Sequence, residues 1–326
     1  HELHKLVGFS AKSLTGESDA AFIGIEAENW SAWEGNNGTG LNVVRLHQAA
    51  YAAHVVRSFE NAVEHRLKVS KTHEKYRRGA EDARLAQIPG IFTENAAAYV
   101  GQLLWLARGT RPDIAHAVQR LSTRISKWSC EEDKALYHLM QYLKGSLNRS
   151  IWYSIDPEEV ARGTVVLHGR ADSDHAGEAT SARSTSGWRL ALEGTRTFAL
   201  LDWGSRRQGG TAKSTPEAEL LAIGDLITRS LAPVGEAISQ AWGRQLFEAA
   251  ETDNDAALAD VRSGHSKKMA YVRHYQKLSI GLVHDYFDED NRELGRVDTN
   301  ANDSDMFTKP LDIEAFERHC ATLYIV

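Results

Sequence analysis

The chain has 326 residues, 42% hydrophobic and 25% charged, which suits a globular protein of about two domains. Its formal net charge of −6 argues against a general nucleic-acid binder with a broad positive face. Residues 1–160 carry 19 basic and 19 acidic side chains, and residues 161–326 carry 19 basic and 25 acidic ones. The negative excess therefore lies in the second half, where an acidic metal-binding site would produce it.

The sequence also sets expectations for the compartment. Cys130 and Cys320 are too few for a zinc site and indicate no disulfide framework, so we expect an intracellular protein, in the cytoplasm or nucleus. The chain contains no run of about 18 apolar residues, so no membrane span is predicted. No signal peptide opens the chain. Because it begins at His1 rather than Met, we expect a piece of a longer protein.

The first ninety residues predict a hairpin, a helix and a loop. Residues 22–30 and 41–46 are typical of two strands, joined by the Asn- and Gly-rich turn at 34–40. Residues 46–67 carry apolar side chains at helical spacing. Residues 70–90 are polar and charged and end in Pro-Gly, so they predict a surface loop.

Residues 95–145 predict three helices in succession. The first ends near Gly109, Pro112 opens the second, and the third ends at Gly145. Their apolar stripes are explained by core packing. We therefore predict a mainly α-helical module.

Strand and helix patterns alternate after residue 150. The predicted strands are 164–174, 184–194, 195–205, 245–253 and 292–299. The predicted helices are 215–242, bent at Pro233, then 266–287, and a last one that begins within 302–311. This order indicates an α/β domain with a mixed sheet.

Four acidic residues stand in or at the ends of these elements: Asp172, Glu219, Asp253 and Asp305. Phosphodiester hydrolysis with two metals needs such a set, because two Mg²⁺ ions about 4 Å apart activate a water and stabilise the leaving oxygen. Carboxylate oxygens suit this hard cation. Among 44 acidic residues such placement can arise by chance, so the spacing alone leaves solvated surface charges as the alternative.

Several motifs in a fixed order resemble the copia-type retrotransposon Pol polyproteins. ADSDHAGEATSARSTSGW (171–188) resembles the opening of their ribonuclease H domain. STPEAELLA (214–222), TDNDAALA (252–259) and NDSDMFTKPL (302–311) resemble its later segments. Upstream, YVGQLLWLARGTRPDIAHAVQRLS (99–122) is similar to the segment that joins the reverse transcriptase to the nuclease. The likeness covers nearly the whole chain.

This resemblance implies a fold and an activity. Residues 160–326 would form a ribonuclease H-like mixed five-stranded sheet flanked by helices. Residues 1–155 would be a reverse transcriptase remnant, similar to its thumb or connection. The implied reaction is endonucleolytic hydrolysis of the RNA strand of an RNA–DNA hybrid with two Mg²⁺ ions, for which Mn²⁺ can substitute. The implied partners are the hybrid and the rest of the Pol polyprotein, with no membrane.

The resemblance also implies roles for single residues. It makes Asp172, Glu219, Asp253 and Asp305 the catalytic and metal-binding residues, with Glu217 as the fallback for Glu219. No paired-Asp polymerase motif is present in the sequence, so no polymerase activity is predicted.

Other positions depart from the family pattern or have open roles. His175 replaces a usual Trp, Pro216 is an extra residue, and Ala270 stands where an Asp is usual. Asp174 would share a strand face with Asp172 and either supports it or is exposed; His274 is a conserved-segment histidine or an ordinary surface one. Two alternatives follow: a catalytically inactive or domesticated fragment that binds nucleic acid or a protein, and an unrelated metal hydrolase.

The loop at 204–214 is the candidate binding site for the substrate backbone. Its glycines allow close approach, and its cations can meet phosphates. The candidate contacts are Arg206, Arg207 and Lys213, with Arg183 and Ser184 as weaker candidates. An ordinary surface loop is the alternative. A hybrid would be recognised by its shape and the RNA 2′-hydroxyls rather than by base edges.

Overall fold

The structure is a computed structural model that describes residues 20–30, 40–74, 85–177, 182–276 and 278–326. The predicted turn at 34–40 falls almost entirely outside these residues, as does the middle of the predicted loop at 70–90. Among the described residues, no helix is both long and apolar enough to cross a bilayer.

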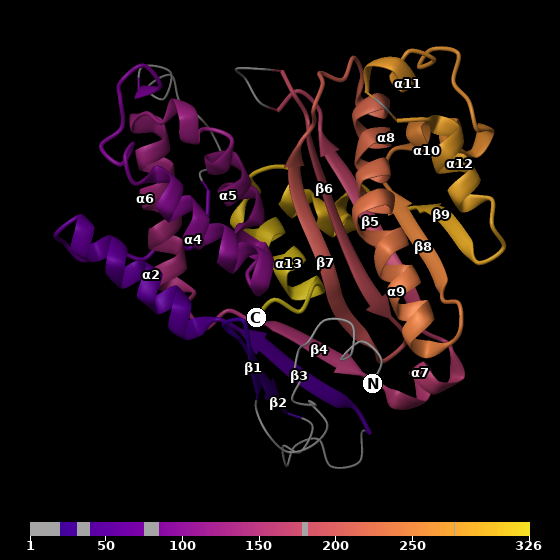
Figure 1. Cartoon of the computed structure of the whole chain (residues 1–326), viewed down its shortest axis with the longest axis horizontal. Helices are drawn as coiled ribbons and strands as arrows, with labels where there is room; N and C mark the ends of the chain where they lie inside the picture. Colours follow the sequence, from indigo (N-terminus) through magenta and orange to yellow (C-terminus); the bar gives the residue numbers. More distant parts are fainter. Residues whose placement is uncertain (1–19, 31–39, 75–84, 178–181, 277) are drawn as a thin grey trace.

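Nine strands of the described chain form one mixed sheet (Figure 1). Across the sheet they follow the order β1 (Ala20–Phe22), β2 (Ile25–Asn29), β3 (Asn42–His47), β4 (Ile151–Ile155), β7 (Phe198–Arg207), β6 (Thr185–Glu193), β5 (Val166–Asp174), β8 (Phe247–Thr252) and β9 (Arg292–Arg296). Strands β5, β6 and β7 are antiparallel neighbours, and β8 and β9 run parallel to β5.

The last five strands have the predicted ribonuclease H-like arrangement. An antiparallel meander, β5-β6-β7, is followed by two parallel strands on the other side of β5, each reached through helices. The sheet does not stop at five strands. The edge of β7 pairs with β4 through Ser154 and Phe198, and β3, β2 and β1 continue beyond it. The first half of the chain therefore contributes strands as well as helices, and β4 is an element that the sequence did not predict.

The helices of the first half agree with the prediction. They are α2 (Ala49–Ala62), α4 (Ala96–Gly109), α5 (Ala115–Ser122) and α6 (Cys130–Gly145). Pro112 begins the short 3₁₀ turn that leads into α5. Ser129 and Glu132 form a capping box that fixes the start of α6.

The helices of the second half are shorter than predicted. They are α7 (Pro157–Arg162), α8 (Thr215–Leu226), α9 (Ala232–Trp242), α10 (Asp255–Ser263), α11 (Val272–Tyr275), α12 (Ile280–Phe287) and α13 (Ile313–Thr322). A π-helical turn, Ile227–Leu231, separates α8 from α9 just before Pro233, whose ring and missing N–H disturb the regular hydrogen-bond ladder. The predicted helix at 266–287 is two short helices, and α10 was not predicted.

The prediction that the last helix begins within 302–311 was wrong. That segment forms a 3₁₀ turn, η6 (Asp303–Phe307), capped by the Asn302 side chain, which accepts a hydrogen bond from Ser304 N. Pro310 follows, and a residue before proline avoids the helical region. The helix α13 therefore starts only at Ile313, after its own cap at Asp312.

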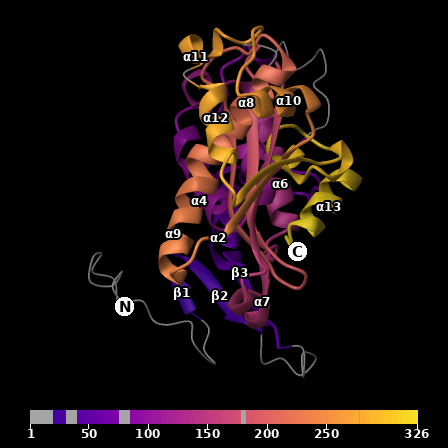
Figure 2. The same ribbon diagram turned by 90° about the vertical axis from the view of Figure 1, so that its right-hand side faces the viewer.

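Two cores hold the chain together. One packs α8, α9, α10 and α12 against one face of the sheet. The other packs the helices of the first half with β7, η6 and α13, and it includes Trp203, Phe307 and Phe316. Figure 2 shows α13 beside the helices of the first half. Ser150 and Val326 exchange backbone hydrogen bonds of 2.7 and 3.0 Å, so the end of the chain closes on β4.

A methyl group at Gly187 of β6 should loosen η6 from the sheet. An ideal Cβ there would lie 2.5 Å from Thr308 Cγ2 and 2.8 Å from Phe307 Cβ. We expect Gly187→Ala to lower the free energy of unfolding by about 1–3 kcal/mol, the usual effect of overpacking. Urea denaturation measures it.

Gly101 provides the matched control, because an ideal Cβ at this position in α4 meets nothing within 4 Å. Gly101→Ala should leave the free energy of unfolding unchanged or raise it by up to about 1 kcal/mol. Equal destabilisation by both substitutions would contradict the tight packing of η6 on β6.

Candidate active site

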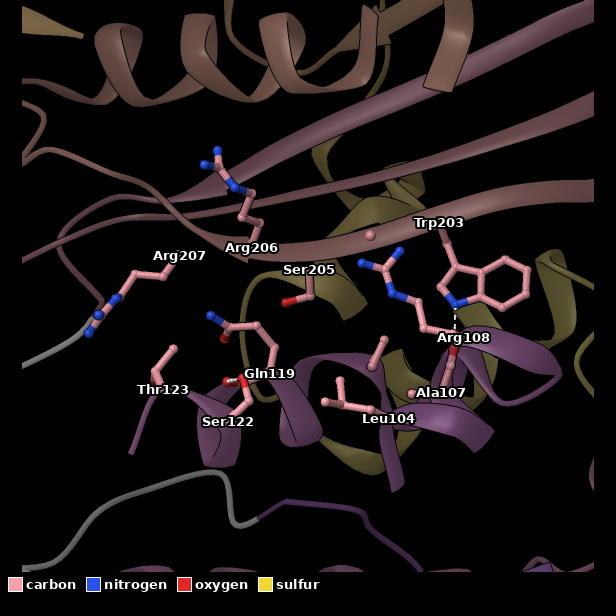
Figure 3. A pocket seen from close by; sticks show the side chains of 12 residues that line it. Leu104, Ala107, Arg108, Gln119, Ser122, Thr123, Trp203, Ser205, Arg206 and Arg207 are labelled. Atoms are coloured by element: carbon pink, nitrogen blue, oxygen red, sulfur yellow. Dashed lines mark hydrogen bonds between the residues drawn. The ribbon is translucent and has the colours of Figure 1, made fainter. Parts of the chain in front are cut away.

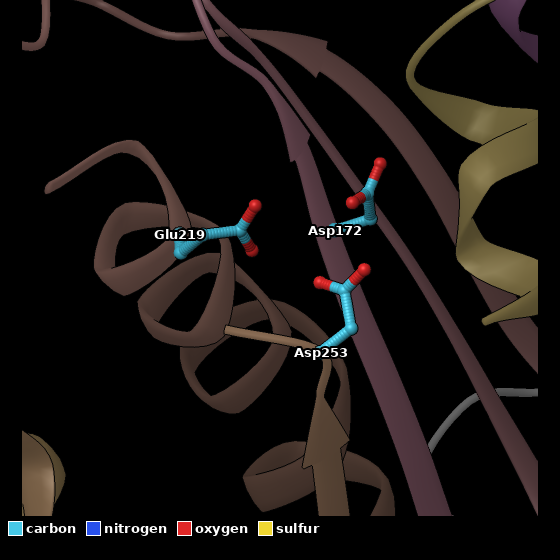
Figure 4. A group of neighbouring side chains, drawn as sticks. All are labelled: Asp172, Glu219 and Asp253. Atoms are coloured by element: carbon cyan, nitrogen blue, oxygen red, sulfur yellow. The ribbon is translucent and has the colours of Figure 1, made fainter. Parts of the chain in front are cut away.

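Three of the predicted carboxylates converge at one end of β5. Asp172 lies on β5, Glu219 on α8, and Asp253 directly after β8. One ligand oxygen from each lies within 4.8 Å of the others. Figure 4 shows the carboxylates of Glu219 and Asp253 turned toward Asp172. We call these residues the three-carboxylate cluster.

The sheet register explains how such distant residues meet. In the parallel pair of β5 and β8, Arg170 lies opposite Glu251. Asp172 and Asp253 each follow two residues later, so they leave the same end of the sheet side by side. Helix α8 packs on β5 and β6, which carries Glu219 to the same end.

Asp305 lies beside this cluster rather than within it. It belongs to η6, where Lys309 Nζ is 2.8 Å from its Oδ1 and 3.9 Å from Asp172 Oδ2. The Thr308 hydroxyl donates to Asp172 Oδ2. Burial, and then the charge of Asp172, raises the pKa of the Asp305 carboxyl. The fourth predicted carboxylate is thus paired with a lysine one helical turn away.

A buried ion-pair group holds η6 against the sheet. Asp303 is fully buried and accepts from Arg170 Nη1 at 2.9 Å and Arg189 Nε at 3.0 Å. Asn302 Nδ2 also donates to the carbonyl of Ala171 at 3.3 Å. These positioning residues were not predicted. The signal in the sequence is an arginine in each of two predicted strands, Arg170 in 164–174 and Arg189 in 184–194.

Glu219 is buried but only partly hydrogen-bonded. Its Oε1 accepts from Ser173 N at 3.3 Å and Ser173 Oγ at 2.9 Å, while its buried Oε2 has no hydrogen-bond partner among the described residues. Burial, and then the negative charge of Asp172, raises the pKa of Glu219 to about 9. The carboxylates therefore lie close together with too little positive charge to balance them.

Glu217, the fallback for Glu219, makes its hydrogen bonds outside the cluster. It is fully buried and accepts from Lys213 N at 2.8 Å, Tyr271 Oη at 2.6 Å and Gln276 Nε2 at 2.9 Å. Its oxygens hold the start of α8 to α11. Only Glu219 of this pair is in the cluster.

His175 and Ala270, which depart from the family pattern, and Asp174 and His274, whose roles were open, lie outside the cluster. His175 Nε2 contacts the carbonyl of Ala212 at 3.2 Å, which ties the end of β5 to the loop before α8. Asp174 packs over Gly177, and burial raises its pKa. Ala270 and His274 are exposed. None of these four belongs to the three-carboxylate cluster.

The candidate backbone contacts are spread over several environments. Arg206 Nη1 pairs with Asp225 at 3.0 Å. In Figure 3 the side chains of Arg206 and Arg207 point in different directions. Lys213 Nζ lies 3.9 Å from the centre of the Tyr271 ring. Arg183 is half-buried. Ser184 is fully buried, and its hydroxyl accepts from Ala176 N, so it serves the fold at that turn.

Comparison with known proteins finds relatives among transposon polyproteins. No protein-family model matches it. The Pol polyprotein of transposon TNT 1-94 from Nicotiana tabacum is 25% identical over 238 residues, 73% of this chain. The homologues of this chain are thus retrovirus-related, copia-like Pol polyproteins of plant transposons. The Pol polyprotein of transposon RE1 from Arabidopsis thaliana is 34% identical over 124 residues, 38% of the chain. This Pol segment spans only 16% and 8% of these two relatives.

A third relative is much shorter. The secreted RxLR effector protein 161 of Plasmopara viticola is 33% identical over 126 residues, which are 39% of this Pol segment and 82% of that protein. The match to the tobacco polyprotein extends over nearly twice as many residues.

Solved structures with a related fold are distant. A ribonuclease H1 from Halobacterium salinarum shares 13% identity, with a TM-score of 0.28 over 43% of this Pol segment and 90% of that chain. A foamy viral protease-reverse transcriptase shares 14% identity, with a TM-score of 0.27 over 44% of this Pol segment and 91% of that chain. The strand order, rather than these superpositions, identifies the ribonuclease H-like fold.

The raised pKa of Glu219 predicts how the stability of the metal-free protein depends on pH. Because the pKa is about 9 in the folded state and near 4.5 when unfolded, the folded protein holds the extra proton between these values. The contribution of this group is complete below about pH 4.5 and is lost as the pH rises. In EDTA, the melting temperature of the wild type should fall more between pH 5 and pH 9 than that of Glu219→Gln. Parallel melting curves for the two proteins would contradict the shift.

Proposed function

We propose that this Pol segment is a metal-dependent ribonuclease H that cleaves the RNA strand of RNA–DNA hybrids internally, leaving 5′-phosphate and 3′-hydroxyl ends. The observation that carries the proposal is the three-carboxylate cluster, with oxygens within 4.8 Å, at the end of the central strand of a ribonuclease H-like sheet. Homology to the Pol polyproteins supports the same reaction.

The side chains of the site fit Mg²⁺ or Mn²⁺. All the candidate ligands are carboxylate oxygens, which hard divalent cations prefer. The buried Glu219 Oε2 lacks a hydrogen-bond partner among the described residues, and burial beside the charge of Asp172 raises the pKa of this carboxyl. In the proposal, Asp172, Glu219 and Asp253 would hold metal, with Asp305 beside them as the fourth ligand. Two such ions would activate the attacking water and stabilise the leaving oxygen.

Neighbouring residues of the chain hold the carboxylates in position. The Thr308 hydroxyl fixes one oxygen of Asp172, and Ser173 fixes one oxygen of Glu219. Carboxylates held in place before the reaction need no reorganisation when charge develops. Lys309 keeps a positive charge beside Asp305, with its Nζ 2.8 Å from Asp305 Oδ1.

The first half of the chain has a supporting role in this proposal. We assign residues 1–155 to a reverse transcriptase remnant and residues 160–326 to the nuclease. The helices of the remnant share a core with β7, η6 and α13, so they brace the nuclease sheet. The missing paired-Asp motif supports a chain without polymerase activity. An inactive fragment remains the alternative; it predicts binding without cleavage.

Removing one carboxylate from the cluster should abolish cleavage. We expect Asp172→Asn to lose roughly 100-fold or more in cleavage rate, because metal stabilisation of a phosphoryl transition state amounts to several kcal/mol. A labelled RNA–DNA hybrid with Mg²⁺ measures the rate, and EDTA should stop the wild type.

Asp285 of α12 offers a matched control. Its carboxylate is exposed and makes no hydrogen bond or ion pair in the described part of the chain. Asp285→Asn should cleave at the wild-type rate. If Asp172→Asn keeps that rate too, the proposed site is wrong; if the wild type itself leaves the hybrid intact, the inactive fragment is the better description.

A further inference from the structure

A groove of about 360 Å³ lies between the helices α4 and α5 and the strand β7 (Figure 3). At its inner end Trp203, 7% exposed, donates from Nε1 to the carbonyl of Ala107 at 2.7 Å. This bond ties β7 to α4. The groove therefore forms only where the first half of the chain packs on the nuclease sheet.

The lining of this groove is basic and polar. It includes three arginines and four uncharged polar side chains, and none of its described lining residues is acidic. The arginines are Arg108, Arg206 and Arg207, and the uncharged polar residues are Gln119, Ser122, Thr123 and Ser205. Arg206 is paired with Asp225, whereas Arg108 has no ion-pair partner among the described residues and so offers its charge to a ligand.

Three of these polar groups have unused hydrogen-bonding capacity. Arg108 is exposed, and within the described residues it makes no hydrogen bond or ion pair. The side-chain amide of Gln119 likewise makes none there. The Ser205 hydroxyl is buried without a partner among the described residues. A ligand with several anionic acceptor oxygens would satisfy all three donors, and a phosphodiester backbone is such a ligand.

The sheet register sets the distance from the groove to the carboxylates. Asp172 pairs with Gly187 on β6, and Gly187 pairs with Ser205 on β7. Directly opposite residues face the same side of a sheet, so Ser205 and Asp172 share a face two strands apart. Two strand spacings are about 10 Å, which is close to the rise of three nucleotides along a duplex strand.

We propose that this groove binds the sugar–phosphate backbone of the hybrid a few nucleotides from the point of cleavage. Arg108 supplies the charge, and Ser205 and Gln119 supply neutral donors. The inference rests on the proposed function for the identity of the substrate. It gives the reverse transcriptase remnant a direct part in holding that substrate, without reading its base sequence.

Salt-dependent binding tests this role with the full chain. Fluorescence anisotropy of a labelled hybrid in EDTA measures affinity without cleavage. A lost phosphate contact reduces the slope of log K against log salt by about 0.9. We therefore expect Arg108→Ala to lower the slope magnitude by about 1 and to weaken binding roughly 8-fold near 0.1 M salt. Gln119→Ala should weaken binding and keep the slope.

Arg57 of α2 is the control arginine. It is exposed, makes no hydrogen bond or ion pair in the described residues, and does not line the groove. Arg57→Ala should bind like the wild type. Equal slopes for Arg108→Ala and Arg57→Ala would overturn the inference, as would a wild type that does not bind the hybrid at all.

The outcomes separate this inference from the proposed function. If the protein binds the hybrid through Arg108 but does not cleave it with Mg²⁺, the proposed nuclease activity is refuted and the proposed role of the groove is supported. If the wild type cleaves the hybrid but Arg108→Ala has the wild-type salt slope, the proposed role of the groove is refuted and the proposed nuclease activity is supported.

Discussion

Mutual repulsion among buried carboxylates is the constraint on which the site depends. Asp172, Glu219 and Asp253 bring their oxygens within 4.8 Å of one another, and Asp305 lies beside them. Burial, and then the negative charge of Asp172, raises the pKa of Glu219 and of Asp305. The fold tolerates this arrangement because hydrogen bonds from Ser173 and Thr308, and the charge of Lys309, offset part of the cost. Bound cations would neutralise the remaining repulsion between the carboxylates. The arrangement that is unfavourable without metal is therefore the one that would bind metal.

The framework around the site keeps the carboxylates from moving apart. Asp303, buried between Arg170 and Arg189, anchors η6 to the sheet and so fixes Asp305 two residues later. From the other side, Phe307 and α13 join the core formed by the helices of the first half. The first half of the chain is thus part of what holds the three-carboxylate cluster and Asp305 in place. The same packing creates the basic groove, so bracing and substrate binding would have one structural origin.

The sequence predicted the elements that carry local signals. Motif order indicated Asp172, Glu219 and Asp253, and periodicity indicated α4, α5 and α6. Asp305 was assigned to the wrong element, since Pro310 delays the final helix. The buried pairs of Asp303 and the continuation of the sheet through β4 depend on contacts between distant segments, which no local pattern encodes. The groove was unpredictable for the same reason, because Arg108 and Ser205 belong to different halves of the chain.

Crystals grown or soaked with Mn²⁺ would test the central claim most directly, because anomalous scattering locates the ion without assuming an activity. We predict an anomalous peak bounded by Asp172, Glu219 and Asp253, with the free oxygen of Glu219 among its ligands. Mn²⁺ bound only elsewhere, with the three carboxylates unoccupied at saturating metal, would contradict a metal-dependent nuclease at this site.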